Sequence, residues 1–152
     1  MLAIRLSLWS IAAGALIPIM AVPNARLGLA LGEPLHASTI LFMVGLVTCV
    51  IISILLTGSI PDFSRLTAVQ PIELAGGLIV GFYVISATLL APRFGVGNFI
   101  LFAVAAQVVS AALIDHFGLF GAVIRPVNPV RLGGISLLLA GRAITQFANA
   151  KV

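Results

Sequence analysis

The stretch "LAGGLIVGFYVISATLLAPRFGVGNFILFAVAAQVVSAALI", Leu74 to Ile114, decides the fold of this chain. Its one charged residue, Arg93, separates uncharged runs of 19 and 21 residues. A helix needs about 20 apolar residues to cross the hydrocarbon core of a bilayer. Because polar and apolar residues do not alternate in these runs, they predict two membrane-spanning helices joined by the short turn "APRFG", and not the strands of a barrel.

The rest of the chain has the same character. Of its 152 residues, 61% are hydrophobic and 8% are charged, whereas about a quarter of the residues of a soluble domain are charged. Two further uncharged runs, Leu6 to Ala25 and Pro34 to Pro61, hold 20 and 28 residues. A fifth apolar segment, Leu132 to about Phe147, is interrupted by Arg142. We therefore predict an all-α integral membrane protein with five transmembrane helices in a single domain, 1–152.

The ends of these helices follow from prolines and charges. We expect helices at about residues 4–22, 37–56, 71–90, 96–114 and 131–148. Pro18 and Pro23 predict a kink or an early end of the first helix, and the connection from Pro23 to Ala37 is expected at the membrane interface. Pro71 and Glu73 suit the first turn of the third helix, since proline needs no donor there and the helix dipole favours an acid.

The sequence has no pattern typical of an enzyme or of a nucleic-acid-binding protein. The eight Lys and Arg residues are spread singly along the chain, as is usual at the ends of membrane helices. His36, Cys49 and His116 do not have the spacing of metal ligands, and there is no phosphate-binding loop, nucleophile elbow or close pair of carboxylates. We therefore expect no catalytic residue, no metal, no cofactor and no nucleic-acid partner.

Gln107 lies in the middle of the second apolar run and shares a helix face with Ser110 and small alanines. Two interpretations stay open. The amide could hydrogen-bond across a helix interface, worth about 1 kcal/mol, or it could line a cavity and bind a solute. Tyr83 lies midway along the preceding helix, where a phenol needs a hydrogen-bond partner. We expect Tyr83 and Gln107 to face the same interhelical space.

Gly77 and Gly81 form a G-x-x-x-G motif, which predicts a close approach of two helix backbones. Asp115 follows Gln107 by eight residues, or about 12 Å along a helix. This depth predicts an acid near the headgroups, paired with a loop arginine, Arg125 or Arg131.

Arg142 is eleven residues past Arg131, which attaches its guanidinium about 16 Å into the membrane if the fifth helix begins at Arg131. Either the side chain faces a cavity, or it extends to the far interface. A fifth helix that ends near Gln146 favours extension to the interface, and we expect that arrangement.

Four segments together resemble the YdcZ-like family of the drug/metabolite transporter superfamily. The most specific is "GGLIVGFYVISATLLAPRFGVGNFILFAVAAQVVSAALIDHFGLFG", Gly76 to Gly121. The segments "PNARLG", Pro23 to Gly28, "FMVG", Phe42 to Gly45, and "GGISLLLAG", Gly133 to Gly141, are similar to the family in order and spacing. The resemblance implies a multi-pass protein of the bacterial inner membrane that forms half of a 5+5 inverted-repeat transporter.

The resemblance also places residues on family motif positions, namely Asn24, Gly77, Gly81, Gln107 and Asp115. We predict a small-solute transporter that works by alternating access as a dimer, with a cavity lined by helices 71–90 and 96–114. The predicted substrate-binding residues are Gln107, Tyr83, Ser110 and Asn24, and the predicted helix-packing residues are Gly77 and Gly81. The alternative is a non-transporting membrane subunit or scaffold that packs against a partner protein.

The first helix has no acid between Arg5 and Arg26, so we do not expect the proton exchange through a helix-one glutamate that four-helix relatives in the superfamily use. The partner is expected to be an antiparallel copy of the chain or a paralogous five-helix subunit. With five spans, the positive charges on the side of the N-terminus are Arg5, Arg65, Arg125 and Arg131. Those on the opposite side are Arg26, Arg93 and Lys151, with Arg142 if it extends outward. This near balance predicts insertion in both orientations.

Overall fold

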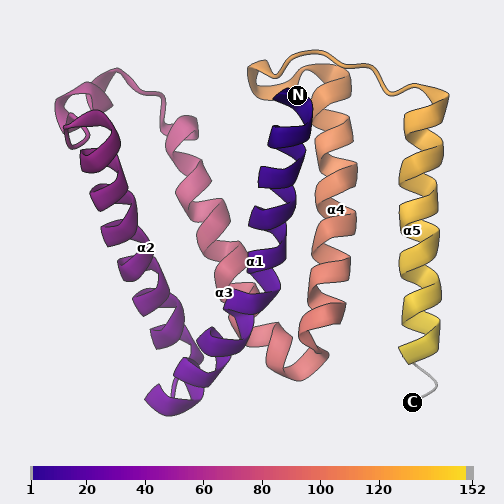
Figure 1. Ribbon diagram of the computed structural model, residues 1–152, viewed down its shortest axis with the longest axis horizontal. Coiled ribbons are helices and arrows are strands. Elements are labelled where there is room, and N and C mark those ends of the chain that lie inside the picture. The colour runs from indigo at the N-terminus through magenta and orange to yellow at the C-terminus, as the bar shows by residue number, and fades with distance from the viewer. Residues whose placement is uncertain (1, 150–152) are drawn as a thin grey trace. The chain divides into compact units, whose positions relative to one another are not determined.

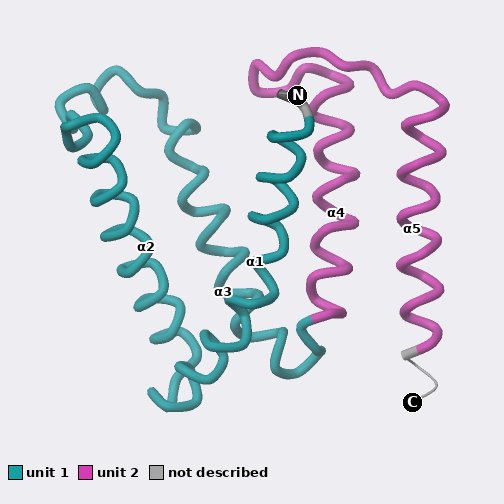
Figure 2. The backbone as a smooth tube through the Cα atoms, viewed as in Figure 1, with its two compact units in different colours: residues 1–96 teal, residues 97–152 magenta. Residues whose placement is uncertain are grey.

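The computed structural model describes residues 2–149, and it is helical throughout its long elements, with no strand in that range. Lys151, which was counted in the predicted charge balance, lies outside the described residues. The chain divides into two compact units, residues 1–96 and 97–152 (Figure 2). Each unit is described by itself.

The first unit contains three long helices that contact one another. Its elements in chain order are α1 (Leu2–Leu31), α2 (Pro34–Thr57), the 3-10 turns η1 (Phe63–Ala68) and η2 (Pro71–Leu74), and α3 (Ala75–Phe94). The second unit is built from α4 (Val96–Phe117), η3 (Leu119–Gly121) and α5 (Pro129–Asn149), and in it α5 runs antiparallel to α4 (Figure 1).

α1 continues nine residues beyond the predicted end at residue 22, so that end is wrong, and the location of the segment from Pro23 onward at the membrane interface stays a prediction. Pro18 and Pro23 both lie inside the helix, and the ribbon changes direction along its length (Figure 1). A proline removes one backbone hydrogen bond and bends a helix, but neighbouring helices can hold the chain helical beyond it. Here the added turns bury Asn24 and Gly28 against the rest of the unit, which stabilises a helix that proline alone would end.

α1 and α2 are joined by a tight turn. Gly32 adopts a positive φ of 73°, which glycine tolerates without steric cost. The carboxylate of Glu33 then accepts a hydrogen bond from the backbone N–H of Leu35, and Pro34 occupies the first position of α2. This is a favourable helix start, since proline lacks the donor that would otherwise be unsatisfied.

The connection between α4 and α5 is also capped at both ends. α4 is followed by Gly118, which has φ +63°. Asn128 precedes α5, and its side chain accepts a hydrogen bond of 2.7 Å from the backbone N–H of Arg131. Pro129 is the first residue of the helix, so α5 begins with the same favourable arrangement as α2.

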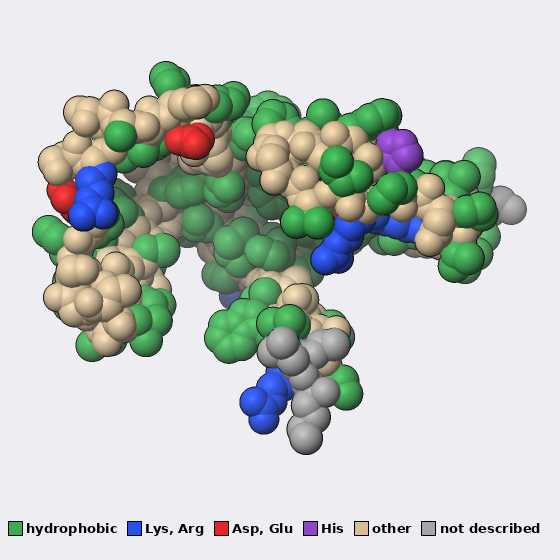
Figure 3. Space-filling model, turned by 90° about the horizontal axis from the view of Figure 1, so that it is seen from above, with side chains coloured by type: hydrophobic (Ala, Val, Ile, Leu, Met, Phe, Trp, Pro, Cys, Tyr) green, Lys and Arg blue, Asp and Glu red, His purple; other side chains and the backbone are tan. Residues whose placement is uncertain are grey.

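The large apolar side chains of the protein lie on its surface, and its interior is built from smaller residues. The buried residues are small or polar, namely Gly28, Ala37, Val84, Ala87, Ala91, Ala105, Ala112, Asn24, Ser38 and Thr88. No large side chain among the described residues is fully buried. Apolar side chains lie across the face seen in Figure 3, among backbone and polar groups, and charged groups occur in a few places only. This arrangement suits a lipid environment, where small residues let helices pack closely and large apolar ones face the hydrocarbon.

Four helical segments are long and apolar enough to cross a membrane. They confirm the helices predicted from the four uncharged runs of the sequence. They are Ile4–Leu31, Pro34–Thr57, Pro71–Phe94 and Val96–Phe117. α5 forms within two residues of its predicted bounds, but it is amphipathic and is not among these four spans. The prediction of five main helices is thus confirmed, and the crossing by α5 stays a prediction.

Candidate functional site

Three polar side chains from three helices meet inside the first unit. The Thr88 hydroxyl of α3 accepts hydrogen bonds from the Asn24 amide of α1 at 2.7 Å and the Ser38 hydroxyl of α2 at 3.0 Å. It donates to the backbone carbonyl of Val84 at 2.9 Å. We call Asn24, Ser38 and Thr88 the Thr88 cluster, and all three are at most 7% exposed.

The Thr88 cluster uses the full hydrogen-bonding capacity of its central hydroxyl. A hydroxyl offers one donor and two acceptor lone pairs, and Thr88 uses all three on the protein itself. A cavity of about 220 Å³ borders Thr88, but a solute there could bond to its oxygen only by displacing Asn24 or Ser38. The geometry therefore favours a packing role for Asn24, and its substrate contact stays a prediction.

The other predicted substrate-binding residues lie on α3 and α4. Tyr83 is half-buried on α3. Gln107 and Ser110 are exposed on α4, three residues apart. Because Tyr83 belongs to the first unit and Gln107 to the second, their sharing of one space stays a prediction.

One close helix approach in the first unit occurs at a glycine that was not among the predicted packing residues. A Cβ atom added to Gly28 of α1 would lie 3.1 Å from the Cα of Pro34 and 3.7 Å from the Cβ of Ala37. A Cβ added to Gly77 or Gly81 meets no described heavy atom within 4 Å. The chain itself thus uses Gly28 for close packing, and a packing role of the G-x-x-x-G motif would require another molecule.

Asp115 forms an ion pair that confirms one of the two predicted partners. Arg131 Nη2 donates to Asp115 Oδ2 at 2.6 Å, and both side chains are 34% exposed. Arg131 Nη1 also donates to the backbone carbonyl of Arg125 at 3.3 Å. The backbone N–H of Arg125 donates in turn to the carbonyl of Asp115 at 2.8 Å. These contacts hold the connection against both helices, so Asp115 and Arg131 support the structure of the second unit.

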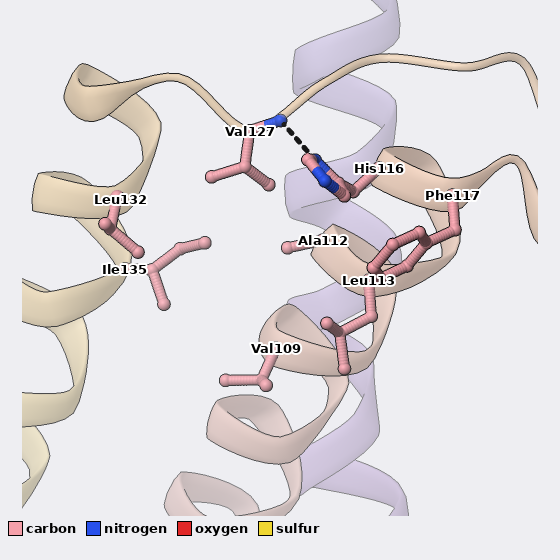
Figure 4. A pocket seen from close by; sticks show the side chains of 8 residues that line it. All are labelled: Val109, Ala112, Leu113, His116, Phe117, Val127, Leu132 and Ile135. Atoms are coloured by element: carbon pink, nitrogen blue, oxygen red, sulfur yellow. Dashed lines mark hydrogen bonds between the residues drawn. The ribbon is translucent and has the colours of Figure 1, made fainter.

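His116 lies beside an apolar cavity of about 330 Å³ in the same unit (Figure 4). Its Nδ1 accepts a hydrogen bond of 3.0 Å from the backbone N–H of Val127, which requires the other ring nitrogen to carry the proton in the neutral form. Leu132 and Ile135 of α5 line the opposite wall. With one imidazole as its polar group, this cavity has little means of fixing the orientation of a polar solute.

Arg142 lies against an aromatic side chain of α4, and its extension to the far interface stays a prediction. Its guanidinium carbon lies 3.2 Å from the ring centroid of Phe102 on α4. Phe102 follows the start of α4 by six residues, or about 9 Å along the helix. The aromatic face thus holds the cation beside α4, because the ring quadrupole attracts it.

The Arg142 side chain lies at a cavity of about 400 Å³ between α4 and α5. The lining residues are Phe102, Ala105, Ala106, Val109, Ser110, Leu139 and Arg142. We call this space the Arg142 cavity. The Nη2 atom of Arg142 is buried and has no hydrogen-bond partner among the described residues.

The described contacts of Arg142 stabilise it by less than the cost of burying its charge and its unpaired donor. Stacking on an aromatic ring contributes about 0.5–2 kcal/mol. An unsatisfied buried donor costs about 1–3 kcal/mol, and an arginine at the centre of a membrane helix costs about 2.5 kcal/mol or more. The combination of a cavity, an unpaired charged donor and the predicted candidate Ser110 makes this the best-formed candidate site in the second unit.

Within residues 2–149, no group of three or more His, Cys, Asp or Glu side chains could hold a metal ion. The family model described as "Putative inner membrane exporter, YdcZ" matches residues 6–144. Comparison with curated proteins and with solved structures finds no match.

Proposed function

This chain belongs to the YdcZ family, and from that premise we propose that it carries a small solute across the inner membrane by alternating access, as a dimer. The family is one of inner membrane exporters and not of enzymes, and the four apolar spans agree with a multi-pass protein. The proposal adds the mechanism, the dimer and the residues that contact the solute.

The observation that carries the proposal is the exposure of Gln107 on α4. Gln107 is eleven residues from the start of a 22-residue helix, so its amide lies near the middle of the span. An amide facing hydrocarbon leaves its polar groups without hydrogen bonds, which costs free energy. A second subunit that encloses a polar path over this face would provide those hydrogen bonds.

We infer a dimer because one chain has a small buried core and encloses too little space for a transport path. Six small apolar residues form the buried core, and inverted copies of a bundle can build a midplane binding site between them. α5 has 21 residues, or about 32 Å of helix, which is enough to cross the membrane as the fifth span. The second subunit in this proposal is an antiparallel copy or a paralogous five-helix chain.

The test is solute-dependent thermal stabilisation of the purified protein across a metabolite panel. A solute that binds only the folded state raises the melting temperature. Gln107→Leu should abolish the rise by removing the amide, whereas Val104→Leu, an exposed apolar position on the same helix, should preserve it. Uptake of the identified solute into proteoliposomes should then show the same dependence on Gln107.

The alternative function is a non-transporting subunit that packs against a partner protein. The many exposed apolar side chains suit such a role as well as they suit lipid. An unchanged response in Gln107→Leu would assign the amide to helix packing. A folded protein that no solute stabilises, and that transports none of the panel, would favour the alternative.

A further inference from the structure

The guanidinium of Arg142 stacks on an aromatic ring with one face, and one of its nitrogens lacks a hydrogen-bond acceptor among the described residues. Phe102 covers it at 3.2 Å from the ring centroid, which limits the directions in which its donors can point. Nη2 is buried without a hydrogen-bond partner among the described residues. A guanidinium is always charged and carries a planar set of donors that matches two oxygens of one anion. An oxyanion would both satisfy these donors and balance the charge.

The surroundings of Arg142 indicate what the anion is attached to. The Arg142 cavity has Ser110 as its other polar side chain, and the remaining wall is formed by apolar groups such as Val109 and Leu139. A volume of about 400 Å³ is at the lower end of the range of about 300–1,000 Å³ for small-molecule sites. An inorganic anion would leave this apolar wall without contacts, so the cavity suits a small molecule with one acidic group and an apolar body.

We propose that the Arg142 cavity binds the carboxylate of a small organic anion. The guanidinium of Arg142 binds the two carboxylate oxygens, and the Ser110 hydroxyl donates to one of them. Phe102 holds the guanidinium in the required plane. The apolar body of the ligand packs against α4 and α5.

The binding site is proposed independently of transport, and only the further step that the bound anion is the solute that the protein exports rests on the proposed function. Binding is measured without transport, so the experiment can refute the carboxylate site and the export function independently of each other. Carboxylate binding without transport would refute the proposed function and leave the site intact. Transport of a neutral solute without carboxylate binding would refute the carboxylate site and leave the proposed function intact.

Benzoate is a suitable probe, because it joins one carboxylate to a small apolar ring, and benzamide is its uncharged counterpart. The purified full chain is placed in phosphatidylcholine nanodiscs, and its melting temperature is followed as each compound is added. Benzoate should raise the melting temperature and benzamide should not.

Substitutions then assign the effect to the cavity. Arg142→Gln should raise the benzoate concentration for half-maximal stabilisation by about tenfold or more, since a charge-assisted bidentate contact is lost. Arg142→Lys should restore only part of the affinity because it keeps the charge but not the planar fork. Arg125→Gln removes an exposed arginine of the same unit and should behave as the wild type.

Ser110→Ala and Phe102→Leu provide a second route if Arg142→Gln does not fold. Each should weaken benzoate binding about threefold or more, by loss of a hydrogen bond or of the stacked ring. Unchanged benzoate binding in the folded Arg142→Gln protein, or in both of these variants, would overturn the proposal. Equal stabilisation by benzamide would overturn it as well.

An anionic lipid headgroup carries the same oxyanion chemistry and is the competing source. Nanodiscs that contain phosphatidylglycerol distinguish the two. If the small organic anion is the ligand, phosphatidylglycerol should leave the benzoate titration unchanged. Phosphatidylglycerol could instead stabilise the wild type but not the Arg142→Gln variant, and abolish the effect of benzoate. In that case the site binds a lipid headgroup and the proposal is wrong.

Discussion

The Thr88 hydroxyl has no hydrogen-bonding position left for a solute, because Asn24, Ser38 and the carbonyl of Val84 occupy all three. Thr88→Val should therefore act on stability and not on solute binding. It leaves the amide and the serine hydroxyl without their acceptor, and we expect the free energy of unfolding to fall by about 1–2 kcal/mol. Thermal unfolding in detergent measures the change.

Thr48→Val is the matched control for that substitution. The Thr48 hydroxyl is exposed on α2 and donates only to the carbonyl of Val44 in its own helix, so its removal should shift the melting temperature little. Equal losses of stability in the two variants would show that the Thr88 cluster contributes nothing beyond the local bond.

Asp62 carries the one residue-scale pH dependence that the structure supports. The side-chain and backbone hydrogen bonds from Ser64, followed by that from Arg65, lower the pKa of the Asp62 carboxyl from its ordinary value. A lowered folded-state pKa means that the cap on η1 is fully formed above the ordinary pKa and is lost as the pH falls through the folded-state value. Ser64→Ala should raise the pKa of Asp62, as measured by NMR titration of its carboxyl carbon. A pKa that Ser64→Ala leaves in place would contradict this assignment.

At the scale of single contacts, sequence reasoning succeeded where few partners were available. Asp115 is one of four acids in the chain, and a loop arginine was the natural partner for an acid at a helix end. The Thr88 cluster was missed because its members are 50 and 64 residues apart, a separation that helical periodicity cannot relate. The signal that could have indicated it is the presence of single hydroxyls in apolar runs, since each needs a hydrogen-bond partner in a membrane.

Among the elements, the helices were foreseen better than their ends. Apolar runs of about 20 residues identify spans by length alone, and this placed all five main helices. The extension of α1 through Pro23 was not foreseen, because it depends on packing of Asn24 and Gly28 against other helices. The contact of Arg142 with Phe102 was not foreseen for the same reason, since Phe102 belongs to a different helix.

The crossing of α1 and α2 at Gly28 gives an element-scale prediction. A Cβ at this position would approach the backbone of Pro34 to 3.1 Å, and backbone atoms cannot move aside as a flexible side chain can. Gly28→Val should therefore force the helices apart and lower the free energy of unfolding by about 1–3 kcal/mol. The yield of folded protein and its melting temperature measure this loss.

Gly81→Val is the control within the same unit, because a Cβ at this position would meet no described atom of another element within 4 Å. The folded chain should tolerate it. If the G-x-x-x-G motif packs against a second subunit, Gly81→Leu should lower the dimer fraction in size-exclusion chromatography with light scattering while the subunits stay folded. An unchanged dimer fraction would place the dimer contact elsewhere.

For the molecule as a whole, the charge balance across the membrane predicts how copies assemble. In the predicted five-span topology, four arginines are on the side of the N-terminus and three positive residues are on the other, with Arg142 as a fourth if it extends outward. A protein with one fixed orientation normally carries a clear cytoplasmic excess of Lys and Arg. We therefore expect the chain to insert in both orientations and to pair with an inverted copy.

Labelling of a single engineered cysteine measures that orientation directly. Ile60 is exposed in the connection after α2, so Ile60→Cys in a Cys49→Ser background should react with an impermeant maleimide from both faces of the membrane. Adding a positive charge to the same connection with Leu66→Lys should shift the labelling toward the cytoplasmic face, because added positive charges favour cytoplasmic retention. Labelling from one face only, in the protein without the added lysine, would rule out dual insertion and leave a paralogous subunit as the source of the inverted half.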